Sequence, residues 1–491
     1  MLIYDKRMKR IALLNLLALM ALSAFGQTNV ELVCSFANGA GKRVELRGYS
    51  DMLTQTEVLL DSAVAAADGS FTLRCYANYP RLVFLQVERY SQSFYIEPGR
   101  RYQVYMPEFD WSLDERQNVC LAPVALPLEF LDLPEGELNL AIMRFEATVD
   151  SFVTAHRTQL DRRFKPDRRC MDTLEVLVGA RRGDTSGNFL ARYMEYRLAE
   201  MRLATGSTSR KKLIDKYITD NPIRYHDDEY MRLFFALHER SISRGSKRVP
   251  QWRLSEWMRR GALDTFLDSL GLEPLLRNEQ VRELAALQAL REAYYDKDYD
   301  RMEVARMVDL LAQNTKFPDH RTLAEALRAS FRSTEREAVL PDFELPDVDR
   351  RRVSLASFRG KWVYLGFVRV ADPHSLKELE TMAHFLDTLA GQHPEVVFLT
   401  VSCDREFQKM YHFLKSNRRG AKCRWTWLHF DGDYRLLERY GVAGYPTFVL
   451  LDPEGRRFYD YTPAPASGFL LRGPWMKTSD PTDYTKPHFS N

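Results

Sequence analysis

Cysteine is scarce in this sequence, and no two cysteines are spaced as C-x-x-C. The 491 residues include six cysteines, too few for a scaffold held together by disulfides. An excess of basic charge is also missing. The chain has 70 Lys and Arg against 67 Asp and Glu, a net charge of +3, which gives no electrostatic reason to expect nucleic acid as a partner. The ten histidines show no H-x-x-x-H or H-E-x-x-H spacing, and phosphate-cradling and dinucleotide motifs are missing. We therefore expect no cofactor and no metal.

Long apolar runs are missing as well, with one exception at the N-terminus. Residues 11–25 are apolar, follow a cationic start at residues 6–10, and are fewer than the ~20 residues that a membrane-spanning helix needs. This layout predicts a secretory signal over residues 1–26, cleaved after Gly26. No cysteine lies at that junction, which speaks against a lipid anchor, and an uncleaved N-terminal anchor is the alternative. We expect a periplasmic protein in a Gram-negative-type envelope, with no transmembrane segment after cleavage.

The length suggests about three domains, and the pattern of the chain divides in the same way. Residues 27–125 alternate apolar and polar side chains in short runs, as an antiparallel β-sandwich would. The pair Asp68-Gly69 predicts a hairpin turn within it. Residues 126–335 predict a helical region, and residues 339–475 alternate strands and helices, the mark of a sheet with parallel strands. Residues 476–491 form a C-terminal tail.

Stripes of large side chains support the helical prediction for the middle region. Val281, Leu284, Leu287 and Leu290 recur at helical spacing, with Asn278 available as an N-cap. A second stripe is aromatic and consists of Phe189, Tyr193 and Tyr196. Such stripes can line a binding groove, but a core between packed helices is the simpler interpretation.

Two segments of the C-terminal region carry a more specific signal. Residues 358–367 read FRGKWVYLGF, and residues 440–448 read YGVAGYPTF and are followed by a strand and a D-P-E-G turn. In this order and at this separation, they resemble the thioredoxin superfamily, in particular the exported thiol-disulfide oxidoreductases of the TlpA and ResA type. The resemblance covers residues 339–475 and implies an α/β thioredoxin-like domain there. The predicted fold class is thus an N-terminal antiparallel β-sandwich, a central α-helical region and a C-terminal thioredoxin-like domain.

The chemistry of that family lies between the two segments, in a W-C-x-x-C motif where the central strand runs into a helix. A cysteine at the helix N-terminus becomes a reactive thiolate, and a second cysteine one turn later resolves the mixed disulfide. Alignment on the following K-E-L run places Asp372 and Ser375 on the two cysteines, with Pro373 and His374 between them. Neither aspartate nor serine can form a disulfide. The sequence therefore predicts a domain that is redox-inactive at its motif and has no catalytic residue there.

Asp372, His374 and Ser375 could instead suggest hydrolysis, but a triad needs three side chains that converge on one reacting atom. Residues so close together at a helix start point in different directions. A structural role is the better interpretation. Asp372 suits the N-cap, Pro373 suits the first helical position, and Ser375 with Glu378 would form an alternative capping box.

The segment Tyr445, Pro446 and Thr447 matches the place of the family's cis-proline. In active relatives this loop faces the redox motif and presents backbone groups to an extended substrate peptide. The resemblance therefore implies a cis bond before Pro446, which proline permits at little cost. Two interpretations remain open. The segment either still forms a peptide-docking groove in a domain without redox chemistry, or it has kept its conformation without any binding function.

The cysteines of this region, Cys403 and Cys423, flank two neighbouring predicted strands. Three interpretations are open: a structural disulfide between them, two buried free thiols, or a redox-active Cys403. The last is the weakest, because Cys403 does not open a helix at the motif position.

Together these features predict an exported thioredoxin-like protein that acts as a binding or scaffold module rather than an enzyme. Its expected partner is another exported or envelope protein, or an extended peptide. The alternative is a TlpA/ResA-type thiol-disulfide oxidoreductase in cell redox homeostasis, acting through the displaced cysteines or through a partner enzyme.

Overall fold

The chain folds into two compact units, and most of the second is the chain from Arg332 onward. The first unit holds the described strands and helices before that residue, apart from residues 88–90 and Val124. The structure is a computed structural model that describes residues 29–108, 124–131, 134, 137–161, 168–179, 189–245, 249–334, 339–459, 462–471 and 473–475. The predicted signal, the predicted tail and Cys120 lie outside the described residues.

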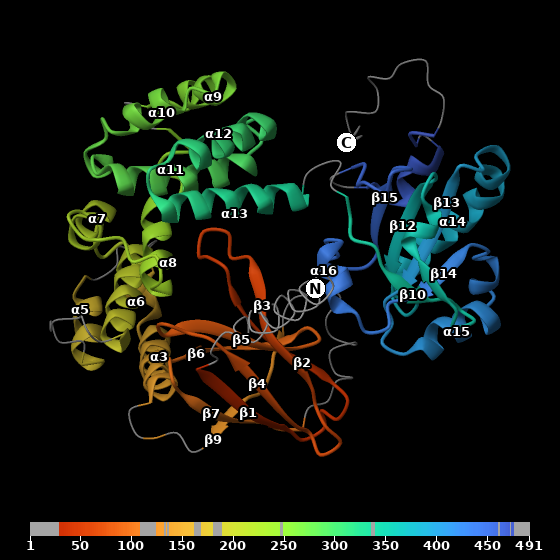
Figure 1. The fold of residues 1–491 in the computed structure, drawn as a ribbon, viewed down its shortest axis with the longest axis horizontal. Helices are drawn as coiled ribbons and strands as arrows, with labels where there is room; N and C mark the ends of the chain where they lie inside the picture. Colours follow the sequence, from red (N-terminus) through yellow and green to blue (C-terminus); the bar gives the residue numbers. More distant parts are fainter. Residues whose placement is uncertain are drawn as a thin grey trace, which may run out of the picture. The chain divides into compact units, whose positions relative to one another are not determined.

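The β-rich part of the first unit consists of two sheets (Figure 1). One has the strand order β4-β1-β7-β9 and the other β3-β2-β5-β6-β8. The strands are β1 (Val30–Phe36), β2 (Arg43–Tyr49), β3 (Glu57–Val64), β4 (Ser70–Cys75), β5 (Arg81–Val87), β6 (Tyr90–Ile96), β7 (Arg101–Met106), β8 (Val124–Ala125) and β9 (Glu129–Leu131). Antiparallel pairing was predicted throughout. β1 and β7 are an exception, because they pair in parallel.

The Asp68-Gly69 turn is present, but it does not close a hairpin within one sheet. It connects β3 to β4, and these strands belong to different sheets. Gly69 has a φ of 80°, and a Cβ there would lie 2.1 Å from the Phe36 carbonyl oxygen, so both backbone and space require glycine. The turn signal was therefore right, whereas the inferred pairing was wrong.

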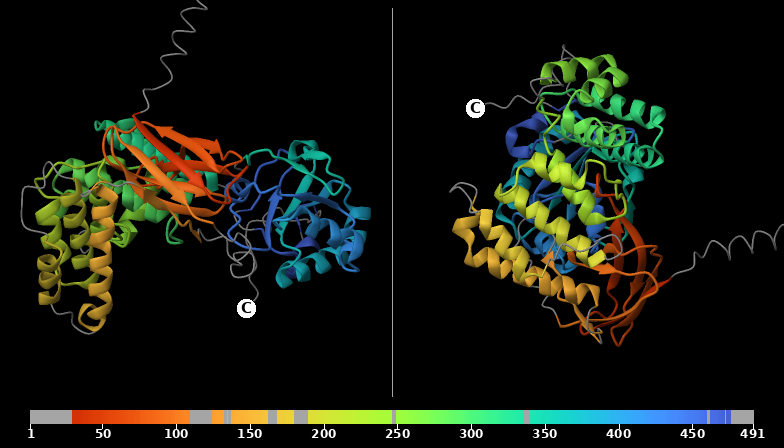
Figure 2. Two further views of the ribbon diagram at one scale, coloured as in Figure 1. Left: turned by 90° about the horizontal axis from the view of Figure 1, so that it is seen from below. Right: turned by 90° about the vertical axis from the view of Figure 1, so that its left-hand side faces the viewer.

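Helices follow the sheets, beginning with α3 beside β6 (Figure 1). They are α3 (Leu138–Ala155), α4 (Arg157–Leu160), α5 (Arg168–Leu177), α6 (Phe189–Thr205), α7 (Arg210–Tyr217), α8 (Asp228–His238), α9 (Gln251–Arg260), α10 (Leu263–Leu270), α11 (Glu279–Tyr294), α12 (Arg301–Asn314) and α13 (Pro318–Thr334). Figure 2 shows α3, α5 and α6 running side by side. Asn278 caps α11 by accepting the Val281 N–H at 3.1 Å, as predicted. Tyr193 and Tyr196 are buried in cores between helices, so the packing interpretation of the aromatic stripe is confirmed.

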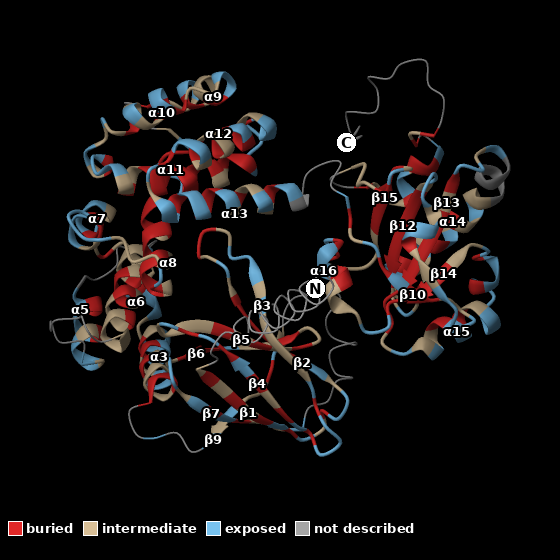
Figure 3. Ribbon diagram, in the orientation of Figure 1, coloured by how far each residue is buried: buried red, intermediate tan, exposed pale blue. Residues whose placement is uncertain are grey.

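The second unit contains a four-stranded sheet of order β14-β13-β12-β15. The central strands β12 (Trp362–Val368), β13 (Val396–Ser402) and β14 (Thr426–His429) are parallel, and β15 (Thr447–Leu451) is antiparallel to β12. The lead-in pair is β10 (Glu344–Pro346) and β11 (Arg352–Ser354), and the helices are α14 (Pro373–Gln392), α15 (Phe407–Ser416) and α16 (Tyr434–Arg439). Figure 3 shows β12 almost wholly buried, which explains its continuous apolar sequence. The predicted fold class is confirmed.

Among the described residues, no helix is long and apolar enough to cross a membrane.

Candidate functional site

The N-terminus of α14 occupies the place that the alignment gave to a redox motif. Asp372 caps this helix, because its Oδ2 accepts the Ser375 backbone N–H at 2.6 Å. Pro373 is the first helical residue, where a backbone N–H is not needed. The predicted N-cap is therefore confirmed. The alternative capping box is not formed, since Glu378 accepts the backbone N–H of Ala466 at 2.8 Å instead.

Replacement of Asp372 by alanine removes this cap, and we expect the free energy of unfolding to fall by about 1 kcal/mol. Asparagine has a side-chain oxygen that can accept the same N–H, so D372N should lose far less. Urea denaturation of the natural chain, D372A and D372N measures both differences. A D372A curve that coincides with the natural one would show that the cap contributes nothing.

The loop between β12 and α14 is tied down by a buried carboxylate just beyond β13. Asp404 is 1% exposed, and its Oδ2 accepts the Val370 N–H at 2.9 Å and the Ser402 hydroxyl at 2.7 Å. Burial raises the pKa of Asp404. At the helix side, the buried Ser375 hydroxyl accepts the Arg369 backbone N–H at 3.3 Å. Both side chains therefore hold the loop in shape.

His429, the last residue of β14, holds the backbone of Asp404 in place and so supports the same loop indirectly. Its Nε2 donates to the Asp404 carbonyl at 2.7 Å, and its Nδ1 accepts the Asp431 N–H at 3.1 Å, so the ring is neutral. Burial lowers the pKa of His429. Neither Asp404 nor His429 was among the predicted site residues. A signal was available, because both lie at the carboxyl ends of adjacent parallel strands, which meet at one edge of a sheet.

The polar residues of the motif do not converge into a hydrolytic site. His374 is exposed at the surface of α14, whereas the Ser375 side chain is fully buried and engaged by the loop. The Asp372 carboxylate accepts a backbone hydrogen bond at the start of α14. The triad alternative is thus excluded by the directions of the three side chains.

The segment around Pro446 lies next to this loop. The Tyr445–Pro446 peptide bond is cis, as the resemblance implies. The guanidinium carbon of Arg369, in the motif loop, lies 5.9 Å from the centre of the Tyr445 ring. Thr447 turns its hydroxyl inward and donates to the Gly444 carbonyl at 2.7 Å. Tyr445, Pro446 and Thr447 are each partly exposed, and their use as a docking groove remains a prediction.

Cys403 and Cys423 do not form the disulfide considered above. Both are free and buried. Side chains alternate across a sheet, and Cys403 packs with Val401 and Leu428 on one face while Cys423 packs with Trp427 on the other. The sheet separates the two thiols, so the interpretation as two buried free thiols is the correct one.

Burial also keeps these thiols in the protonated form. It raises the pKa of Cys423 to about 12 and raises that of Cys403, where the nearby Asp404 carboxylate acts in the same direction. The Tyr445 hydroxyl has a smaller effect on the pKa of Cys403, in the opposite direction. The reactive species in thiol chemistry is the thiolate, so neither group is a nucleophile at neutral pH.

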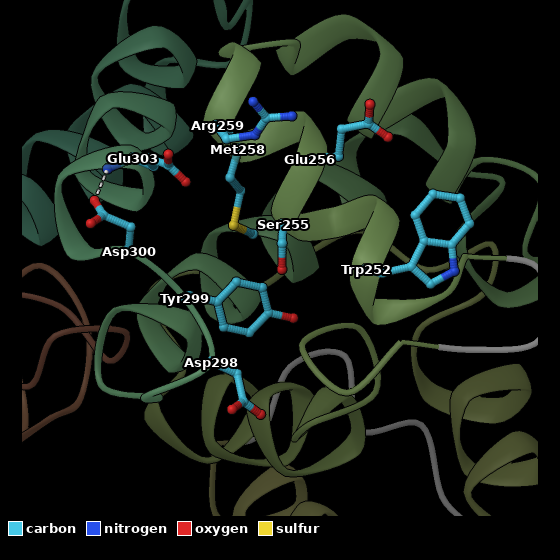
Figure 4. A pocket seen from close by; sticks show the side chains of 9 residues that line it. All are labelled: Trp252, Ser255, Glu256, Met258, Arg259, Asp298, Tyr299, Asp300 and Glu303. Atoms are coloured by element: carbon cyan, nitrogen blue, oxygen red, sulfur yellow. Dashed lines mark hydrogen bonds between the residues drawn. The ribbon is translucent and has the colours of Figure 1, made fainter.

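A hollow of about 330 Å³ in the first unit collects acidic side chains between α9 and α12 (Figure 4). Asp300 caps α12 and accepts the Glu303 N–H at 3.0 Å, and Glu256 pairs with Arg260 at 2.6 Å. These carboxylates therefore have structural partners. Across the part of the chain that the structure describes, no group of His, Cys, Asp or Glu is arranged to hold a metal ion.

Comparison with known proteins identifies the second unit. A family model described as thioredoxin-like matches residues 360–457. The thiol-disulfide oxidoreductase ResA of Bacillus subtilis is 27% identical over 135 residues, which are 28% of this chain and 72% of ResA. The thioredoxin domain of a thiol-disulfide oxidoreductase from Bacteroides vulgatus is 25% identical, with 25% of this chain and 85% of that chain covered and a TM-score of 0.23. A thiol-disulfide oxidoreductase from Bacteroides fragilis is 18% identical, with 27% and 98% covered and a TM-score of 0.24.

Residues 360–457 form a thioredoxin-like domain. In sequence this domain is similar to a thiol-disulfide oxidoreductase, ResA. Within the thioredoxin-like domain, residues 372–375 read Asp-Pro-His-Ser, and neither Cys403 nor Cys423 lies at the start of α14. The domain therefore has a thioredoxin-like fold, and the N-cap of α14 occupies the position that the alignment gave to the redox motif.

Proposed function

We propose that this chain is an exported thioredoxin-like protein that binds an extended segment of another envelope protein without exchanging disulfides. One observation carries the proposal. The two motif positions hold Asp372 and Ser375, whose side chains are committed to the start of α14 and to the loop before it. The position of a nucleophilic thiol is thus filled by a group that stabilises the structure.

The other thiols support a function without redox chemistry. Cys34, Cys75, Cys403 and Cys423 are buried and form no disulfide. Burial raises the pKa of Cys34 to about 12 and that of Cys75 to about 11, besides the shifts at Cys403 and Cys423. An oxidoreductase acting through displaced cysteines would need an accessible thiol of low pKa, and none of these four has that character.

The docking surface that we propose combines the exposed start of α14 with the cis-proline segment. Pro373 and His374 are exposed, and the Arg369–Tyr445 contact joins the two halves of the surface. A segment in extended conformation suits this place, because it can pair with backbone groups beside Pro446 while its side chains reach His374. Export is supported by the signal-like N-terminal sequence.

Site-specific photo-crosslinking tests the binding function. A benzophenone amino acid replaces His374 in one chain and the exposed Glu380, further along α14, in a matched control. We expect a discrete adduct with an envelope protein from position 374 only. The adduct should form equally well with a reducing agent present and in a C403S background. Equal crosslinking from both positions, or no adduct at 374, would refute the docking surface, and an adduct abolished by reductant or by C403S would favour the oxidoreductase.

A further inference from the structure

The first unit contains a cavity of about 740 Å³, between β6, the segment after β8 and the helices α3, α6 and α8. This volume lies in the range of small-molecule sites. Much of its wall is apolar or aromatic, formed by Leu82, Phe94, Leu126, Phe130, Ile142 and Tyr193. An apolar wall of this kind favours a ligand with an apolar body.

Two charged residues on one face of α8 interrupt this wall. Glu229 and Arg232 are one helical turn apart, and their Oε1 and Nη1 atoms are 3.3 Å apart. The Tyr95 hydroxyl donates to the same carboxylate oxygen at 3.2 Å. The Glu229 side chain is 2% exposed and that of Arg232 is 39% exposed, so the guanidinium is the accessible member of the pair. Within the described structure, Glu229 is the one ion-pair partner of Arg232, which leaves guanidinium donors for a ligand.

The buried carboxylate makes the charge of this cavity depend on pH. Burial raises the pKa of Glu229 to about 7, against the attraction of Arg232. A folded-state pKa above the ordinary value means that the protonated form is favoured by folding, and this stabilisation is lost as the pH rises through 7. At neutral pH and above, the ionised carboxylate of Glu229 therefore lowers the stability of the folded protein. Groups with strongly shifted pKa values are common at functional sites. The titratable and charged groups that face it are Tyr95 on β6, Tyr193, Arg197 and Glu200 on α6, and Arg232 on α8.

We propose that this cavity binds a small organic anion, whose single charge is held by Arg232 and whose aromatic or aliphatic body lies against the apolar wall. When Glu229 is protonated, Arg232 gives the site a net positive charge, which complements a carboxylate or sulfonate. A cationic ligand would instead be repelled by the accessible guanidinium. The site lies in the first unit and is independent of the function proposed for the thioredoxin-like domain.

Two fluorescent probes that differ in one charge test this proposal on the whole mature chain. One is the anion 8-anilinonaphthalene-1-sulfonate, and the other is neutral N-phenyl-1-naphthylamine. We expect the R232M variant to bind the anion about tenfold more weakly, since it loses one charge-assisted contact, and to bind the neutral probe as the natural chain does. An equal loss for both probes, or no loss for either, would overturn the role of Arg232.

A pair of methionine variants tests whether the probes occupy this cavity. Met143 lines the cavity and is 60% exposed, so M143W should narrow it without disturbing a core. Met302 is 69% exposed on α12 and gives the matched control M302W. We expect M143W to weaken both probes and M302W to leave both unchanged. If M143W binds them as M302W does, or if the natural chain binds neither probe, the proposal is wrong.

The pH dependence supplies a further check. Only the form with protonated Glu229 favours the anion, so its affinity should be up to about tenfold higher at pH 6 than at pH 8. E229Q removes the titrating group and should bind the anion equally at both pH values. A natural chain with pH-independent affinity, or an E229Q variant with the natural dependence, would contradict the proposed role of Glu229.

Discussion

We expect the double variant D372C/S375C to reduce the disulfides of insulin more than about tenfold faster than the background rate, and the natural chain not to reduce them at all. Residue 372 lies at the helix N-cap, where the helix dipole stabilises a thiolate. Residue 375 lies one turn on, within reach of a disulfide to residue 372. Serine to cysteine is a small change, so the variant should retain the loop before α14.

The single variants D372C and S375C are the matched controls. D372C should form mixed disulfides that are not resolved, and the buried S375C should react slowly. Reduction of insulin by the natural chain would refute the redox-inactive domain. A folded double variant that stays inactive would show that the framework around the motif has diverged along with its chemistry.

The second large effect is a loss of stability in acid that comes from one buried histidine. His238, the last residue of α8, is 3% exposed. Its Nδ1 donates to the Phe234 carbonyl at 2.9 Å, and its Nε2 is buried without a hydrogen-bond partner in the described structure. Protonation would place a charge where nothing accepts the new N–H. Burial accordingly lowers the pKa of His238 from 6.5 to about 4.

A lowered histidine pKa means that the unfolded chain takes up its proton first as the pH falls. The contribution of His238 to stability is complete above pH 6.5 and is lost as the pH falls towards 4, by up to about 3 kcal/mol. H238Q keeps a donor for the Phe234 carbonyl but does not titrate. Urea midpoints measured from pH 7 to pH 4 should therefore fall more steeply for the natural chain than for H238Q. Parallel curves would contradict the prediction.

Features set by neighbours in the chain were predictable from the sequence. The role of Asp372 as an N-cap followed from residues 372–375 alone, and Asn278 was found in the same way. The thioredoxin-like domain was recognisable because residues 358–367 and 440–448 resemble that family, and the first of these segments contains most of the continuous apolar run of β12.

Features that depend on contacts between distant segments were not predictable. The residues around Cys403 and Cys423 in the sequence do not indicate which face of the sheet each thiol occupies. In the structure they lie on opposite faces. The parallel pairing of β1 with β7 joins segments about seventy residues apart, which an antiparallel alternation pattern cannot reveal. The hydrogen bond between His429 and Asp404 also joins distant segments, but here the position of both residues at the carboxyl ends of predicted strands was a usable signal.

Differential alkylation with mass spectrometry, applied to the exported chain at glutathione potentials from roughly −300 to −150 mV, tests the central claim most directly. The account predicts that no pair of cysteines changes state across this range, because Cys34, Cys75, Cys403 and Cys423 are buried thiols whose pKa is raised, and the motif holds no cysteine. A coupled, reversible change at Cys403 and Cys423 would contradict it and would assign the thioredoxin-like domain a displaced redox site.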